Sequence, residues 1–220
     1  MHVLKPLSLS NNRFTANWRR AWRIYRANPM SCALPVIDFT GFADAGAAGD
    51  ERRRAIAQEI GAACRETGFF ALTGHGIDAK LIDSAFAMAQ NFFDLPEEKK
   101  REIAIEHSPC HRGWFAYGGE VLDKTKQPKG DYKEGLKIGR DLPPDHARVK
   151  AALPLHGANQ YPSESGALCG FRNTMDTLYG ACESVSRHLM QAFALSLDLP
   201  PNHFDRWLNE PMATLSPLRY

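Results

Sequence analysis

The stretch ETGFFALTGHGI, residues 66–77, places a compact apolar run between two glycine breaks. Residues 69–76 predict a short strand that leads into a glycine-flanked turn. Upstream, residues 49–68 carry Ile56, Ile60 and Cys64 at intervals of four, which predicts one apolar face of a helix that Gly68 ends. A helix followed directly by a strand is half of an α/β unit.

The neighbouring segments complete that unit. Residues 34–39, LPVIDF, are a β-branched run opened by proline, which predicts a first strand. Asp78 is placed to cap a second helix. The predicted apolar face of that helix consists of Ile82, Ala85, Phe86, Ala89 and Phe93. Residues 95–103 predict a short helix with Pro96 in its first turn. The order strand, helix, strand, helix indicates an α/β fold class.

Glycine and proline interrupt the chain from 106 to 165, where we expect short extended pieces at 113–117 and 132–138. A long helix is predicted over 167–197, because apolar residues recur there at steps of three and four. Its apolar stripe consists of Leu168, Phe171, Met175, Leu178, Cys182, Val185, Leu189 and Phe193. Residues 212–220 have the pattern of a strand.

The composition limits the class of protein. The 220 residues, 44% of them hydrophobic, suit one large domain or a domain with part of another. The sequence contains no run of 18 apolar residues, so we expect no membrane span. The five cysteines form no CxxC pair, which favours free thiols in a reducing compartment and a cytoplasmic location.

Positive charge is concentrated at the start of the chain. Residues 1–29 contain six basic residues and no acid, which leaves 21 basic against 25 acidic residues in 30–220, a net charge of −4. The main part of the chain therefore offers no general footprint for nucleic acid. The arm itself has three interpretations: a transit peptide, a phosphate-binding segment with stacking aromatics, or a disordered leader before a true start at Met30.

His203 and Asp205 have the spacing of a histidine and a carboxylate bound to one iron. On a helix, however, side chains two positions apart point about 200° away from each other. The local sequence favours a helix, because Pro200 and Pro201 precede it and Asn202 can serve as its N-cap. No histidine follows Asp205, so we interpret His203 as a surface residue at a helix start.

Other candidate side chains have structural interpretations. His107, Cys110 and His111 lack the second pair that a structural zinc site needs. His75 is expected to bond the backbone of its own turn. Glu97 and Glu98 stand in a first helical turn, where acids favour the helix dipole without any catalytic role.

Six short segments of the sequence occur in the same order as in one known family. They are LPVIDF, ETGFFALTGHGI, FFDLPEEKK, RGWFAYGGE, DYKEGLKIGRDLP and PMATLSPLRY. Together they resemble the N-terminal part of the iron(II)/2-oxoglutarate-dependent dioxygenases of the isopenicillin N synthase type, over about residues 34–220. This resemblance implies an α/β (α+β) region beside a double-stranded β-helix, or jelly roll, with a long supporting helix and most of the jelly roll missing. The implied division is a basic disordered leader at 1–33, a non-haem dioxygenase N-terminal domain at 34–155, supporting helices at 156–211 and the first jelly-roll strand at 212–220.

The resemblance also implies a partial site. Tyr220 matches a tyrosine that binds 2-oxoglutarate in relatives, although Leu218 replaces an asparagine found in plant members. Arg112, Phe115 and Tyr117 match a loop near the substrate pocket. The iron ligands of the family follow the strand at which this chain ends, so no catalytic or metal-binding residue is assigned and the chain alone is expected to be inactive.

The expected protein is therefore an oxidoreductase that uses Fe(II) and 2-oxoglutarate, with ascorbate as a further candidate cofactor, to oxidise a small molecule. It is expected to bind neither nucleic acid nor membrane, and its partner would be the missing C-terminal jelly roll. Fragmentation of 2-oxoglutarate, as in ethylene- and succinate-forming enzymes, is one reaction that the resemblance allows. Two other functions stay open: an inactive binding or regulatory module, and a nucleic-acid-associated protein that acts through residues 1–29.

Overall fold

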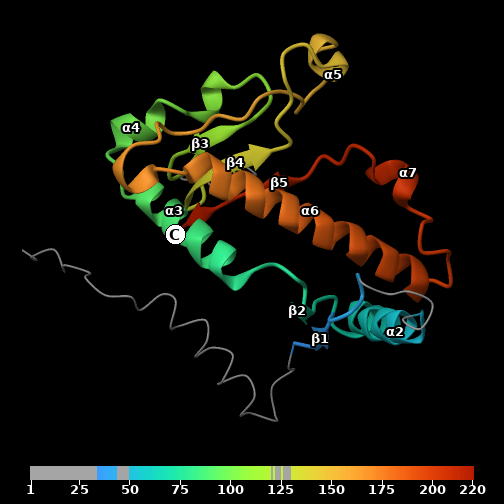
Figure 1. Ribbon diagram of the computed structural model, residues 1–220. Coiled ribbons are helices and arrows are strands. Elements are labelled where there is room, and N and C mark those ends of the chain that lie inside the picture. Colours follow the sequence, from blue (N-terminus) through green and yellow to red (C-terminus); the bar gives the residue numbers. More distant parts are fainter. Residues whose placement is uncertain (1–33, 44–49, 120, 122–124, 126–129) are drawn as a thin grey trace, which may run out of the picture.

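The computed structural model describes residues 34–43, 50–119, 121, 125 and 130–220. The predicted leader at 1–33 lies outside these residues. One long helix, α6 (Phe171–Ser196), runs diagonally through the molecule. A sheet and helix α3 (Ala79–Phe93) lie at its N-terminal end, and helix α2 (Asp50–Glu66) lies at its C-terminal end (Figure 1).

The first α/β unit forms as the sequence predicts. Strands β1 (Val36–Asp38) and β2 (Ala71–Thr73) pair in parallel, with Ile37 opposite Leu72. Helix α2 connects them, as a parallel pair requires a crossover. The first core cluster joins this unit to the end of α6 and consists of Ile37, Phe39, Phe42, Ile56, Ile60, Ala63 and Ala192.

Two details of the predicted helix faces are wrong. Cys64 is exposed, and Ala63 is buried in its place. On α3, Phe86 is 71% exposed, whereas Phe92 is fully buried. The apolar face of each helix is wider than the surface that its neighbour covers, so some apolar side chains stay exposed to solvent. The position of the neighbouring helix decides which ones are buried. The cap at Asp78 is confirmed, because its carboxylate accepts a hydrogen bond from the Lys80 amide at 2.9 Å.

The second half of the chain builds a small antiparallel sheet. Strand β4 (Glu134–Gly139) pairs with β3 (Gly113–Phe115) on one side. On its other side it pairs with β5 (Thr214–Leu215) and β6 (Leu218–Arg219). The extended pieces predicted at 113–117, 132–138 and 212–220 are thus confirmed as parts of one sheet. Short helices α4 (Glu97–Arg101) and α5 (Ala147–Lys150) lie in the connections.

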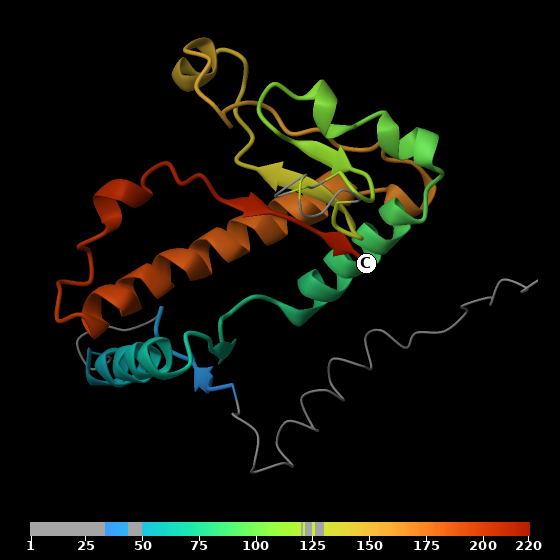
Figure 2. The ribbon, with the colours of Figure 1, turned by 180° about the vertical axis from the view of Figure 1, so that it is seen from behind.

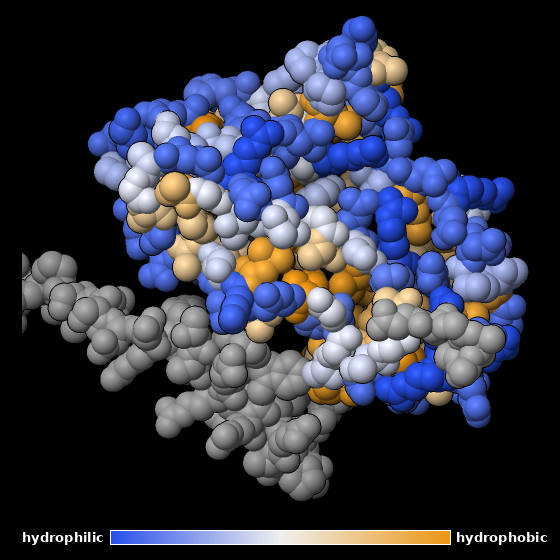
Figure 3. Space-filling model, viewed as in Figure 1, coloured by the Kyte–Doolittle hydropathy of each residue, from blue (hydrophilic) through white to orange (hydrophobic). Residues whose placement is uncertain are grey.

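The predicted long helix is confirmed, although its first residues form a separate 3-10 turn, Gly166–Leu168. Residues Phe171 and Met175, at the N-terminal end of α6, are fully buried in a second cluster with α3 and the sheet. Between the two clusters the predicted stripe is only half-buried, as at Val185. Apolar side chains gather on the face between α3 and α6 (Figure 3).

After α6 the chain turns through α7 (Asp205–Leu208) and returns along the long helix to the sheet (Figures 1 and 2). The Tyr179 hydroxyl of α6 donates to the Ala213 carbonyl of this returning segment at 3.3 Å. The N-cap of α7 is Phe204, so the prediction of Asn202 in that role is wrong. None of the helices in the described part of the chain has both the length and the apolar character that crossing a membrane requires.

Candidate functional site on the outer face of the sheet

The four-stranded sheet has two faces of different character. Trp114, Leu136 and Ile138 belong to the core cluster shared with α3 and α6, so they define the core face. Side chains alternate along a strand. Phe115, Gly135, Lys137, Gly139 and Leu218 therefore belong to the opposite side, which we call the outer face. The register is continuous across β4, β5 and β6, with Glu134 opposite Arg219 and Gly139 opposite Thr214.

Two glycines of β4 allow close approach on the outer face. A β-carbon at Gly135 would lie 2.4 Å from Cζ of Phe115 and 2.7 Å from Cδ2 of Leu218. A β-carbon at Gly139 would lie 2.1 Å from Nη2 of Arg112. Because both positions lack a side chain, the Phe115 ring and the Arg112 guanidinium pack directly against the backbone of β4.

Arg112 is only 3% exposed and is held by backbone groups. Its Nη2 donates to the Leu155 carbonyl at 3.0 Å, and its Nη1 donates to the Cys110 carbonyl at 3.3 Å. Its Nε has no hydrogen-bond partner. Beside it is a cavity of about 10 Å³, space for one water molecule, whose charged and histidine lining is Arg112, Arg140, His146, Arg148, His156 and Glu210.

Lys137 is the only residue of β4 with a side chain on the outer face. Its ammonium donates to Nε2 of His111 at 3.0 Å and lies 5.3 Å from the centre of the Phe115 ring. The backbone of His111 has φ of 60°, a left-handed conformation that is uncommon outside glycine. The lysine ammonium therefore lies between the buried Phe115 ring and the His111 imidazole.

The other predicted site residues lie at the edge of this face. Tyr117 is 44% exposed, and its ring centre lies 5.3 Å from that of Tyr132. Tyr220 follows β6 and is 80% exposed. The contacts with Gly135 and Gly139 place Phe115 and the Arg112 guanidinium on one face. The assignment of Arg112, Phe115, Tyr117 and Tyr220 to substrate or cofactor stays a prediction.

A buried ion pair lies under the sheet on its core face. The Glu134 carboxylate accepts from Lys100 Nζ at 2.7 Å and from the Trp114 indole nitrogen at 2.9 Å. Arg219 of β6 lies 3.9 Å from the same carboxylate and pairs with Asp94 at 2.8 Å. These contacts fix β4 and β6 to the segment that follows α3.

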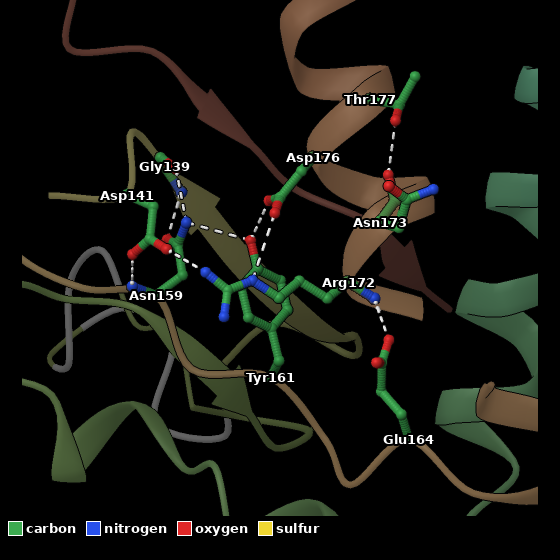
Figure 4. Close-up of polar contacts among 9 residues, drawn as sticks. All are labelled: Gly139, Asp141, Asn159, Tyr161, Glu164, Arg172, Asn173, Asp176 and Thr177. Carbon is green, nitrogen blue, oxygen red and sulfur yellow. Dashed lines mark hydrogen bonds and ion pairs between the residues drawn. The ribbon is translucent and has the colours of Figure 1, made fainter. Parts of the chain in front are cut away.

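A second polar network joins the end of β4 to the start of α6 (Figure 4). The Asn159 side chain bonds both backbone groups of Gly139, at 2.9 and 2.8 Å. Arg172 bridges Asp141 at 2.7 Å and Asp176 at 3.4 Å. Tyr161 donates to Asp176, and burial together with this carboxylate raises the pKa of the tyrosine. This network fixes Gly139 at the end of β4, the residue against which the Arg112 guanidinium packs.

The histidines and the cysteine that the sequence offered as candidate ligands make structural contacts. His75 accepts a hydrogen bond from the Ile77 amide at 3.1 Å, which confirms its expected role in the turn. Cys110 is buried, with its sulfur 3.3 Å from the Ser108 hydroxyl. The His203 ring contacts Phe204 and Trp207. Among the described residues, no three His, Cys, Asp or Glu side chains lie together in a way that could hold a metal ion.

Sequence reasoning missed Lys137, both outer-face glycines and the Glu134–Lys100 pair. The signal was present in EGLKIG, residues 134–139, where small and large residues alternate. Read with the period of a strand, this segment separates Glu134, Leu136 and Ile138 from Lys137.

Known proteins resemble this chain over most of its length. Residues 34–164 match the family model described as non-haem dioxygenase in morphine synthesis, N-terminal. A Dictyostelium discoideum protein named "Probable iron/ascorbate oxidoreductase" is 34% identical over 185 residues, 81% of this chain and 50% of that protein. A 2-oxoglutarate-dependent dioxygenase from Aspergillus niger is 28% identical, over 85% of this chain and 55% of its own length.

Solved structures of similar proteins also superimpose on most of this chain. The C-terminally truncated form of a Neurospora crassa protein, solved in apo form, superimposes with a TM-score of 0.68 at 27% identity, over 87% of this chain and 63% of its own. A putative 2OG-Fe(II) oxygenase family protein from Caulobacter crescentus gives 0.69 at 26% identity, over 86% and 57% of the two chains. The full-length Neurospora crassa protein has also been solved in complex with alpha-KG and thymine. This chain spans about half the length of the curated relatives it matches.

Proposed function

Because this chain belongs to the non-haem dioxygenase family, we propose that it forms the N-terminal part of an Fe(II)/2-oxoglutarate-dependent oxygenase that acts on a small molecule. The match over residues 34–164 carries this proposal. Iron and 2-oxoglutarate carry the oxidation in enzymes of this class, while the protein binds and orients the substrate.

The described residues do not by themselves fit an iron site, since no three suitable ligands lie together among them. The proposal assigns the metal ligands to sequence beyond residue 220, in keeping with relatives that are about twice as long. The role of residues 34–220 is then to supply one wall of the substrate pocket, with Arg112, Phe115 and Tyr117 near the substrate and Tyr220 near 2-oxoglutarate.

The face between α3 and α6 supports this division of labour. Phe86 of α3 is 71% exposed, and the middle of α6 is only half-buried. Large exposed apolar patches mark interaction sites. We assign this face to the remaining half of the oxygenase, a jelly roll of the same protein.

The decisive experiment combines DNA sequence and turnover. The coding DNA is read past the codon for Tyr220, and succinate formation from 2-oxoglutarate is measured with and without Fe(II). The purified 220-residue chain should form no succinate above the iron-free control, whereas a longer product with two further histidines and a carboxylate should form it. Stoichiometric, iron-dependent succinate from the 220-residue chain would contradict the assignment of the ligands.

The same apolar face favours one second candidate, a family member that acts as a binding or regulatory module without catalysis. In that case the coding sequence would stop after Tyr220, and a specific protein would copurify through the α3 and α6 face. Replacement of Phe86 by serine should then release that protein.

A further inference from the structure

The cavity beside Arg112 has an excess of positive charge. Its lining contains three arginines, Arg112, Arg140 and Arg148, and a single carboxylate, Glu210. Arg148 pairs with that carboxylate, so the charges of Arg112 and Arg140 have no acidic partner in the lining. Positive groups beside a low-dielectric wall attract anions strongly.

Arg112 brings an unsatisfied donor to this lining. Its side chain is buried, and its two terminal nitrogens donate to the carbonyls of Cys110 and Leu155. Its Nε has no hydrogen-bond partner in the described part of the chain. A buried charged donor that lacks a protein partner indicates a bound water or ion. The cavity of about 10 Å³ has room for one such atom, a water oxygen or one oxygen of a larger anion.

Arg140, which follows β4 directly, is half-buried. Within the described residues, no hydrogen bond or ion pair neutralises its guanidinium, because the neighbouring Asp141 pairs with Arg172 at 2.7 Å instead. Burial raises the pKa of Tyr179 on α6, whereas the charges of Arg112 and Arg140 lower it. Both arginine charges therefore act at the same point of α6, close enough together to act on one ligand.

The remaining wall of the cavity is held in place by its own contacts. His146 Nδ1 accepts a hydrogen bond from the Arg148 amide at 3.3 Å, and His156 Nε2 accepts one from Arg148 Nη1 at 3.3 Å. His156 Nδ1 donates to the Pro154 carbonyl at 2.8 Å. The Arg148 side chain is 40% exposed, so the lining extends from the buried Arg112 to the surface.

We propose that this cavity binds an oxyanion, a carboxylate or phosphate group, with one oxygen beside Arg112 and the charge of the group balanced by Arg140. Anion binding at this cavity requires neither iron nor turnover. Because the proposed function places Arg112 near the substrate, the oxyanion is assigned to the substrate, and that assignment rests on the proposed function.

The test is an NMR titration of the 220-residue chain with sodium phosphate, with sodium acetate and, as a control for ionic strength, with sodium chloride. Proton–nitrogen spectra record the Nε–H group of Arg112. Phosphate, acetate or both should shift this signal in a saturable way, and chloride at the same ionic strength should not. A response to only one of the two oxyanions would identify the group that the cavity prefers.

Two substitutions in the lining should act in opposite directions. Arg140→Gln should weaken oxyanion binding at least about tenfold, the loss of one charge-assisted contact, and Arg140→Lys, which keeps the charge, should restore part of it. Glu210→Gln should strengthen binding, because it removes the carboxylate of the lining and releases Arg148 from its ion pair. A merely structural role of these residues would not produce stronger binding in Glu210→Gln.

The matched control is Arg54→Gln. Arg54 is an exposed arginine on α2 that pairs with Asp50 at 3.6 Å and lies outside the cavity lining, so its loss should leave oxyanion binding unchanged. Circular dichroism of each variant would show that it is folded. Arg140→Met provides a second neutral variant if the glutamine variant does not fold.

Three outcomes would overturn the inference. They are no saturable shift with either oxyanion, which would assign the cavity to water alone, an equal shift with chloride, and oxyanion binding unchanged in both neutral Arg140 variants. Succinate formation is measured separately, so failure of oxyanion binding and failure of the proposed oxygenase activity give different results.

Discussion

At the scale of single residues, the glycines of β4 explain how the site face is built. Gly135 and Gly139 are in a regular strand, where glycine is otherwise unfavourable. Each one faces a large group within contact distance: the Phe115 ring at Gly135 and the Arg112 guanidinium at Gly139. A missing side chain at these two positions therefore determines how close the aromatic ring and the cation lie to the sheet.

Gly135→Ala should lower the free energy of unfolding by about 1–3 kcal/mol, because the new methyl group would overlap Phe115 and Leu218. Urea denaturation measures this change. Gly180→Ala is the matched control, since Gly180 is exposed within α6 and nothing lies within 4 Å of its missing β-carbon. That control should stabilise the protein by about 0.5–1 kcal/mol. Equal effects of the two substitutions would show that the close approach at Gly135 is absent.

At the scale of secondary-structure elements, the polar network around Tyr161 joins two parts that are far apart in sequence. Asn159 holds the end of β4 through Gly139, and Arg172 holds Asp141 from the first turn of α6. Exposed ion pairs contribute little singly, and a network that includes the half-buried Tyr161 contributes more. The network therefore fixes the strand that carries Lys137 against the helix that spans both cores.

Stability should fall in alkaline solution because of Tyr161. Burial and the Asp176 carboxylate raise its pKa in the folded state, so its contribution is complete below about pH 10, the ordinary tyrosine value, and is lost as pH rises further. The free energy of unfolding, measured by urea at about pH 8 and about pH 11, should fall more in the wild type than in Tyr161→Phe.

Tyr132→Phe is the control for this experiment, because Tyr132 is 84% exposed. This variant should keep the pH dependence of the wild type. If Tyr161→Phe also kept it, the contact between the tyrosine and Asp176 would not contribute to stability.

At the scale of the whole molecule, α6 joins two separate hydrophobic clusters. One contains α3 and the four-stranded sheet, and the other contains β1, β2 and α2. Between them, α6 and α3 leave apolar side chains on one face (Figure 3). The two clusters bury the two ends of α6, whereas the middle of the helix is only half-buried.

Phe86→Ser should change the free energy of unfolding by less than about 0.5 kcal/mol, because Phe86 is 71% exposed and its side chain buries little area. The same substitution should reduce self-association and the binding of a hydrophobic dye, which sedimentation velocity and fluorescence measure. Phe92→Ala provides the contrast: Phe92 is fully buried, and its loss should cost about 3–5 kcal/mol. Unchanged dye binding in Phe86→Ser would show that the exposed apolar surface that binds the dye lies elsewhere.

The sequence by itself determined the local elements and the family. Residues 34–39 and 69–76 gave the parallel strands, Asp78 gave a helix start, and the apolar steps over 167–197 gave the long helix. These features depend on neighbours within one or two turns of chain, so their period is visible in the sequence. The six phrases over 34–220 indicated the family, and the match over 34–164 confirmed it.

Only the tertiary structure decided which side chains meet. Phe86 and Phe92 are both apolar and both on α3, yet contacts with α6 and the sheet bury only Phe92. Lys137 and Arg112 are 25 positions apart from one another, and the pairing of β3 with β4 brings them to one face. Such contacts join residues distant in sequence, and no local period encodes them, because packing between whole elements sets which face is covered.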